Sequence, residues 1–256
     1  MNQRVLISGA SIAGPALAYW LARRGFRPTV VERFGELRPG GNGVDIRGAS
    51  VGIAERMGIL PELRRHATQI DDTTFVDAGD RRTANIPMTT FNAGGDIEIM
   101  RGDLARVVHD ATKDDVEYVF GDSISAIDDH GPAVTVTFDS GEVREFDLVV
   151  GADGLHSAVR GLTFGPDSEA MFEGAHLLAA ELEAAGGDHT VAFRRYEEKF
   201  RPTVKKRQAS VRASAAILIP RSRAGIWTRN QFTRLMGLQT AASFVYRRTT
   251  SLPEAG

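Results

Sequence analysis

The chain has 256 residues, of which 42% are hydrophobic and 25% charged, and its formal net charge is −2. This is the composition of an ordinary globular protein of one or two domains, and the near-neutral charge excludes a globally basic nucleic-acid-binding protein. The absence of cysteine excludes disulfides, thiolate metal sites and a catalytic cysteine. No run approaches ~18 uninterrupted apolar residues, and the N-terminus lacks a signal-peptide pattern. We therefore expect a cytoplasmic protein without a membrane span.

The beginning of the chain predicts a β-α-β unit. Residues 4–8 form an apolar strand-like run, residues 15–24 an apolar-rich helix followed by Gly25, and residues 29–32 a β-branched strand. Two strands joined through a helix run parallel, with a right-handed crossover. These features favour an α/β fold of the Rossmann-like, three-layer kind.

Further elements follow in chain order. A glycine-rich connection spans residues 39–48, and helices are expected at 49–57, 60–67 and 101–111. Strands are expected at 73–76, 97–100, 116–120, 134–138 and 148–150, and the turn Asp139-Ser140-Gly141 indicates a β-hairpin. Residues 175–185 and 190–201 are expected to be helices, the second ending before Pro202.

The C-terminal part of the chain is basic and is also expected to be helical. Between residues 191 and 256 there are fourteen Lys and Arg residues against three Glu and no Asp. Two interpretations remain open: a solvated helical surface, or a basic face directed at an anionic cofactor or partner. The expected apolar stripe comprises Trp227, Phe232, Leu235 and Met236.

A dinucleotide-binding fingerprint follows the first strand. In Gly9-x-Ser11-x-x-Gly14, the first glycine permits a tight turn and the last permits close packing of helix on strand, while Ile12 and Ala13 lie between them. Ser11 stands where a second glycine is usual, and its hydroxyl can donate to a phosphate oxygen. The helix N-terminus supplies free N–H groups for a diphosphate. Glu32 ends the second strand, where an acid accepts hydrogen bonds from ribose hydroxyls. This motif fits NAD and FAD equally well.

Three further segments narrow the choice of cofactor. Residues 147–160 (DLVVGADGLHSAVR) contain Asp153 and Gly154, Arg101-x-x-Leu104 opens a helix, and residues 43–48 (GVDIRG) contain Asp45. Together they resemble the FAD-dependent aromatic hydroxylases, the class A flavoprotein monooxygenases of the p-hydroxybenzoate hydroxylase type. The resemblance covers residues 3–165 and implies a Rossmann-like three-layer FAD-binding domain with a C-terminal helical segment.

The resemblance implies a cofactor, a reductant and a substrate class. It implies FAD as cofactor, NAD(P)H as reductant and a small aromatic molecule as substrate. In this reading Arg101 reaches the FAD, and Asp153 lies near it with a second role toward NADPH. Arg38 corresponds to a basic residue that contacts the nicotinamide cofactor in the family, although an exposed loop arginine is an equal reading. Arg33, beside Glu32, is included in the same predicted site.

The family pattern is incomplete after the Asp-Gly motif. The third family fingerprint, a Gly-Asp motif before a late helix, is missing, and the segment from residue 168 to 174 leads directly into a helix. The sequence thus predicts a FAD-binding domain at 1–172 without its substrate domain, and a C-terminal helical segment at 173–256. A homodimer or a partner protein would then be needed to complete the site.

Three hypotheses about function follow. The first is a FAD-binding oxidoreductase of the monooxygenase family, and the second is a non-hydroxylating flavin-binding remnant or an uncoupled NAD(P)H oxidase. The third is an NAD-dependent dehydrogenase, but Tyr196-x-x-Lys199 is one residue shorter than the required Tyr-x-x-x-Lys. The six histidines show no metal-ligand spacing, and the catalytic residues stay unassigned.

Overall fold

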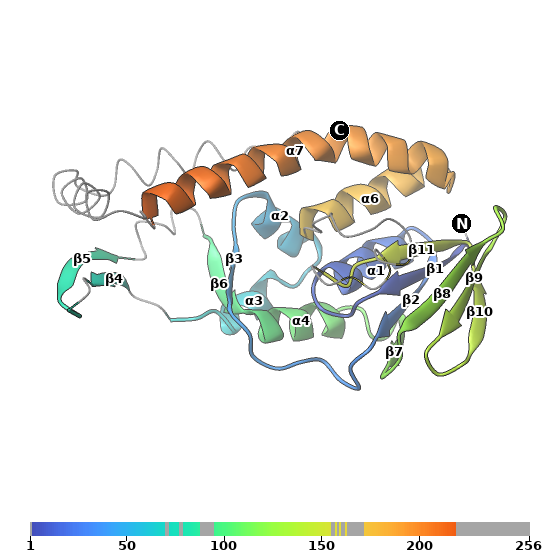
Figure 1. The fold of residues 1–256 in the computed structure, drawn as a ribbon, viewed down its shortest axis with the longest axis horizontal. Coiled ribbons are helices and arrows are strands. Elements are labelled where there is room, and N and C mark those ends of the chain that lie inside the picture. Colours follow the sequence, from blue (N-terminus) through green and yellow to red (C-terminus); the bar gives the residue numbers. More distant parts are fainter. Residues whose placement is uncertain are drawn as a thin grey trace.

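The computed structural model describes residues 2–69, 72–76, 79–87, 95–154, 157, 159, 162 and 172–218. Its centre is a four-stranded parallel sheet in the order β11-β1-β2-β7 (Figure 1). These strands are β1 (Arg4–Ser8), β2 (Arg27–Glu32), β7 (Glu117–Phe120) and β11 (Leu148–Gly151). All three pairings are parallel, as the β-α-β pattern predicts.

Alternating side chains of the central strands face two different layers. Val5 and Ile7 of β1 pack among the helices, whereas Leu6 between them packs on the opposite side against an antiparallel sheet. That second sheet has the order β10-β9-β8, built from β8 (Ile124–Asp129), β9 (Val134–Phe138) and β10 (Val143–Phe146). The period of two along a strand therefore produces the three layers, and the predicted α/β class is confirmed.

The helical layer comprises α1 (Ala13–Arg23), α2 (Ala49–Arg56), α3 (Leu60–Arg65) and α4 (Arg101–Asp110). Beside it, β3 (Gly43–Ile46) pairs antiparallel with β6 (Ile97–Met100). A separate hairpin, β4 (Asp72–Val76) and β5 (Arg82–Pro87), lies away from the central sheet (Figure 1). Strand β3 falls inside the connection that the sequence predicts to be irregular, because pairing with β6 organises a glycine-rich segment that has little strand propensity.

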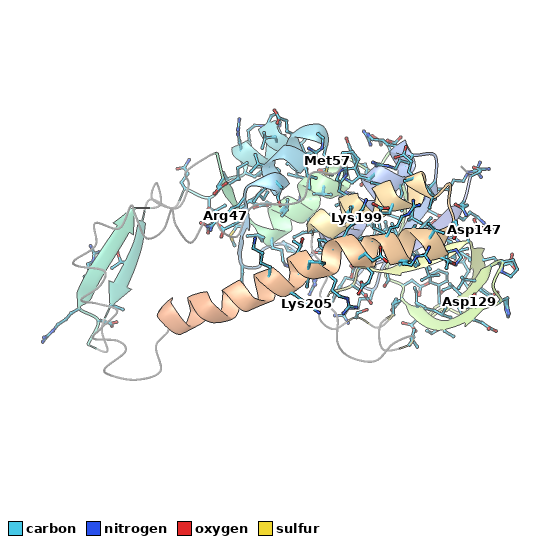
Figure 2. The ribbon with its side chains drawn as sticks, turned by 90° about the horizontal axis from the view of Figure 1, so that it is seen from above. Arg47, Met57, Asp129, Asp147, Lys199 and Lys205 are labelled. Carbon is cyan, nitrogen blue, oxygen red and sulfur yellow. The ribbon has the colours of Figure 1, made fainter. Side chains whose placement is uncertain are left out.

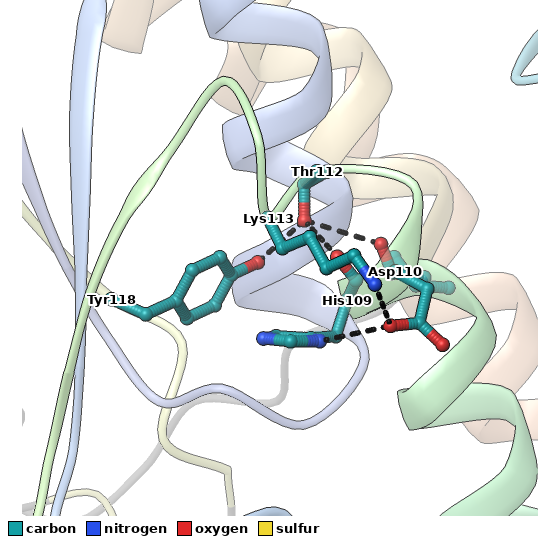
Figure 3. Close-up of polar contacts among 6 residues, drawn as sticks. His109, Asp110, Thr112, Lys113 and Tyr118 are labelled. Atoms are coloured by element: carbon teal, nitrogen blue, oxygen red, sulfur yellow. Dashed lines mark hydrogen bonds and ion pairs between the residues drawn. The ribbon is translucent and has the colours of Figure 1, made fainter.

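Helix α4 is fixed to the central sheet at its C-terminal end by a buried threonine. The Thr112 hydroxyl donates to the carbonyl oxygen of His109 at 2.9 Å and lies 2.6 Å from the Tyr118 hydroxyl on β7 (Figure 3). Since Thr112 has one hydrogen to give, Tyr118 donates to it. Burial raises the pKa of Tyr118 to about 12, so the tyrosine remains a protonated donor at neutral pH.

Two C-terminal helices cover α1. Helix α6 (Phe172–Ala184) packs on α1, and α7 (His189–Leu218) packs on α6 (Figure 1). Lys199 of α7, labelled in Figure 2, forms a 2.6 Å ion pair with the buried carboxylate of Glu181 on α6. This pair fixes how the two helices align, because an unpaired buried carboxylate is strongly unfavourable.

The prediction that the second of these helices ends before Pro202 is wrong, because α7 continues through it. Pro202 is exposed, so the carbonyl group that loses its hydrogen bond four residues earlier can turn to water. Residues 219–256, including Trp227, Phe232, Leu235 and Met236, lie outside the described residues. Among the helices that the structure describes, none is long and apolar enough to cross a membrane.

The contact between α1 and α6 is expected to make stability depend on pH. The His176 ring of α6 lies 4.5 Å from the Trp20 ring of α1. Burial, together with the charges of Arg56 and Arg24, lowers the pKa of His176 to about 4. The unfolded chain, with a histidine pKa of about 6.5, therefore binds more protons between pH 4 and 6.5. The free energy of unfolding should therefore rise with pH through this window, and above it the free-energy penalty of keeping His176 uncharged should be absent.

Urea unfolding between pH 4 and 7 measures this dependence. We expect His176→Gln to reduce the slope of stability against pH, because the titrating group is removed. The same substitution at the exposed His130 serves as the control and should leave the slope unchanged. Equal slopes in wild type and His176→Gln would contradict the assignment.

Candidate functional site

The turn after β1 has a conformation that favours glycine. Gly9 has φ +106°, and its N–H donates to the carbonyl oxygen of Val31 at 2.8 Å. A Cβ at this position would lie 2.7 Å from the carbonyl oxygen of Ala152. A Cβ on Gly14 would collide with the carbonyl oxygen of Gly9, so the start of α1 also packs directly on the turn. Both glycines of the fingerprint thus allow close contacts between backbone segments.

The N-terminus of α1 has no side-chain cap. Ile12 occupies the N-cap position without a side-chain cap, and the first turn, all of it described, contains no acidic residue. Its N–H groups and the positive end of the helix dipole therefore have no competing anion within the helix. This arrangement suits a phosphate group.

The carboxylate of Glu32 is fixed by two backbone groups. Its Oε2 accepts a hydrogen bond from the N–H of Ala10 at 2.9 Å, and its Oε1 accepts one from the N–H of Phe34 at 3.2 Å. These contacts link the end of β2 to the fingerprint turn. Because each carboxylate oxygen has a second lone pair, Glu32 can still accept hydrogen bonds from a ligand.

Arg101 begins α4 and reaches the same turn. Its N–H donates to the carbonyl oxygen of Asn42, and its Nη1 donates to Oγ of Ser11 at 3.2 Å. The next residue, Gly102, is so close to the glycine-rich connection that a Cβ would lie 2.6 Å from the backbone nitrogen of Gly40. The connection thereby holds the first turn of α4 and directs the Arg101 side chain toward Ser11.

The fingerprint turn, the end of β2 with the residues after it, and the first turns of α4 form the walls of one cleft. Four predicted site residues line it, namely Ser11, Glu32, Arg38 and Arg101, with four residues that were not predicted: Ala10, Glu36, Leu37 and Ala105. Ala105 follows Arg101 by one helical turn, so helix periodicity could have identified it. Nothing in the sequence distinguishes Glu36 from an ordinary surface carboxylate. The cleft contains two arginines and two glutamates.

Asp153 lies beside the fingerprint turn, and its own loop holds its carboxylate. Oδ1 accepts a hydrogen bond from the Ser157 hydroxyl at 2.5 Å, and Oδ2 accepts one from the N–H of Val159 at 3.3 Å. A Cβ on Gly9 would lie 2.8 Å from the Cα of Asp153. Gly154 follows with φ +81°, a conformation that favours glycine. The backbone of this motif therefore supports the turn.

The structure does not place every predicted residue in the cleft lining. Asp45 on β3 pairs with Arg47 at 2.8 Å, and Leu104 is buried in the helical layer. Arg33 is exposed, and its guanidinium lies 4.9 Å from the centre of the Phe34 ring. Arg38, which does line the cleft, has its guanidinium 4.5 Å from the centre of the same ring. Ile12 and Ala13 belong to the half-buried turn before and at the start of α1.

The fold and the cleft are those of a dinucleotide-binding α/β protein. Among the described residues, no group of three or more His, Asp or Glu side chains could hold a metal ion. The model of the family described as "FAD binding domain" matches residues 2–226. The chain belongs to this family, and the expected resemblance to flavin-dependent monooxygenases is confirmed at the level of the family.

Several known proteins resemble the chain. An uncharacterized protein of Mycobacterium tuberculosis, Rv1260, is 48% identical over 169 residues, which cover 64% of this chain and 45% of the relative. A flavin-dependent monooxygenase of Legionella longbeachae is 38% identical over 165 residues, covering 64% and 42%. The chain thus spans less than half the length of these curated relatives.

Solved structures share the fold. The tetracycline destructase Tet(51) matches with a TM-score of 0.78 and 24% identity, covering 99% of this chain and 100% of that one. The structure of CtdE in complex with FAD matches with a TM-score of 0.56 and 19% identity, covering 63% and 40%. At these identities the likeness concerns the fold alone.

Alanine substitutions at Gly9 and Gly52 should change the free energy of unfolding in opposite directions, because the two glycines have different surroundings. Gly9→Ala should lower the free energy of unfolding by about 1–3 kcal/mol or more, since it combines a strained φ with a clash against Ala152. Gly52→Ala, inside α2, meets only the end of Arg56 at 3.8 Å and should stabilise by about 0.5–1 kcal/mol. Urea unfolding of both variants measures the contrast, and equal stabilities would show that the turn tolerates a side chain.

Proposed function

We propose that the chain is an oxidoreductase that holds FAD in the cleft and oxidises NAD(P)H in the cytoplasm. The observation that carries this proposal is the convergence of Ser11, Glu32 and Arg101 in one cleft at the fingerprint turn that precedes α1. A cation, a hydroxyl and free N–H groups suit a diphosphate, and a fixed carboxylate suits the hydroxyls of a ribose. FAD carries both groups at its nucleotide end.

The residues present fit that end of FAD. Gly9 and Gly14 let the fingerprint turn pack closely on the backbone after β11 and on the start of α1, and Arg101 would neutralise part of the charge of the diphosphate. When bound, FAD supplies hydride and electron transfer, while the protein binds and orients it. The proposed cofactor-binding residues are Gly9, Ser11, Ile12, Ala13, Gly14, Glu32, Arg33, Arg38, Asp45, Arg101, Leu104, Asp153 and Gly154.

We further propose that the chain divides into a FAD-binding domain at 1–172 and a helical segment at 173–256. Strand β11 ends at Gly151 and α6 already begins at Phe172, which leaves little chain for a substrate domain between them. Transfer of oxygen to a small aromatic molecule requires a pocket that excludes water. The protein by itself should therefore convert NAD(P)H, a proton and O2 into NAD(P)+ and hydrogen peroxide. A second copy or a partner protein would be needed to complete the pocket.

Cofactor binding tests the nucleotide site first. Wild type should bind FAD more tightly than NAD+, with altered flavin fluorescence on binding. Arg101→Ala should weaken FAD binding by about 1.5–3 kcal/mol, because a charge-assisted hydrogen bond is lost. Arg106→Ala, on an exposed position of the same helix, is the matched control and should bind as wild type does. Tight NAD+ binding without affinity for FAD would exclude the proposed cofactor.

The balance of products tests the proposed reaction. With FAD bound, consumption of NAD(P)H should be matched by hydrogen peroxide across a panel of phenolic compounds, with little hydroxylated product. The assay measures all three quantities in the same reaction. If most reducing equivalents appear as hydroxylated product, the chain possesses a closed substrate pocket and the uncoupled reaction is wrong.

A further inference from the structure

Ser11 is the one position where the dinucleotide fingerprint of this chain departs from glycine. Its side chain lines the cleft, and its Oγ accepts a hydrogen bond from Nη1 of Arg101 at 3.2 Å. In the part of the chain that the structure describes, the hydroxyl donates to no protein acceptor. Because a hydroxyl carries one hydrogen and two lone pairs, Ser11 can hold the arginine and still donate to a ligand.

The guanidinium of Arg101 needs a contact that fixes its position, and the hydrogen bond to Ser11 provides one. Its near end is fixed, since α4 is docked on the glycine-rich connection and Cβ of Arg101 packs beside Gly41. Its far end is a planar guanidinium on a flexible aliphatic stem, in a cleft that also contains Glu32 and Glu36. Either carboxylate could draw the guanidinium away from the N-terminus of α1. The hydrogen bond to Ser11 keeps it at the turn.

We infer that Ser11 is a positioning residue that fixes Arg101 for a diphosphate ligand. In this chain the serine adds a function that glycine lacks, since it joins the fingerprint turn to α4 through one side-chain contact. The inference rests on the proposed function, because it deepens the nucleotide site described above. It predicts that restoring the usual glycine weakens binding.

A double-mutant cycle on the full chain tests this coupling. The dissociation constants of FAD and ADP are measured for wild type, Ser11→Gly, Ser11→Ala, Arg101→Ala and the double variant with Ser11→Gly and Arg101→Ala. We expect Ser11→Gly and Ser11→Ala each to raise the dissociation constant about tenfold, because a hydrogen bond to a charged group is lost. In the Arg101→Ala background the same change should cost less than about threefold. Thermal unfolding without ligand should be unchanged in all variants.

The outcomes separate the inference from the proposed function. An equal effect of Ser11→Gly with and without Arg101 would mean that the hydroxyl acts only by direct contact, and the inference would be wrong. Unchanged or tighter binding by Ser11→Gly overturns it as well, because the serine would then be only a tolerated substitution. If wild type binds neither FAD nor ADP, the proposed function itself fails. ADP lacks the flavin, so a parallel shift for both ligands locates the effect at the nucleotide end.

Discussion

The cleft depends on a close approach between backbone segments at Gly9. The turn after β1 lies against the start of α1, the residues after β11 and the end of β2, and a Cβ at Gly9 would collide with Ala152. Because parallel strands end on the same edge of a sheet, the groups that follow β1, β2 and β11 meet there. Without glycine at the turn, α1 could not begin close enough for its N–H groups to face the same space as Glu32.

Among the described residues, α4 is the only helix or strand outside the β1-α1-β2 unit that lines the cleft. Its N-terminal end is held by the glycine-rich connection at Gly40, and its C-terminal end is tied to β7 through Thr112 and Tyr118. A helix fixed at both ends has little freedom to shift along its axis. The position of the Arg101 backbone is thus set by packing, and only its side chain remains to be ordered.

Local features of the fold and the site could be predicted from the sequence, and long-range contacts could not. The β-α-β unit, the turn with Gly9 and Gly14, and Glu32 at the end of β2 follow from one continuous pattern over residues 4–32. Strand β3 pairs with β6, and Glu36 lines a cleft that Arg101 and Ala105 complete. These partners lie far along the chain, and no local pattern reveals them. The continuation of α7 through Pro202 could not be predicted either, because proline is a local signal for the end of a helix.

The C-terminal helices support the same helix that forms the cleft. Trp20 and Arg24, near the end of α1, contact His176 and Glu183 of α6, and the Arg24–Glu183 ion pair is 2.6 Å long. Helix α7 in turn stabilises α6 through Lys199 and Glu181. Since α1 is a rigid body eleven residues long, contacts at its C-terminal end restrict the orientation of its N-terminal end. The segment after the Asp-Gly motif therefore contributes to the nucleotide site through packing on α1, without itself lining the described cleft.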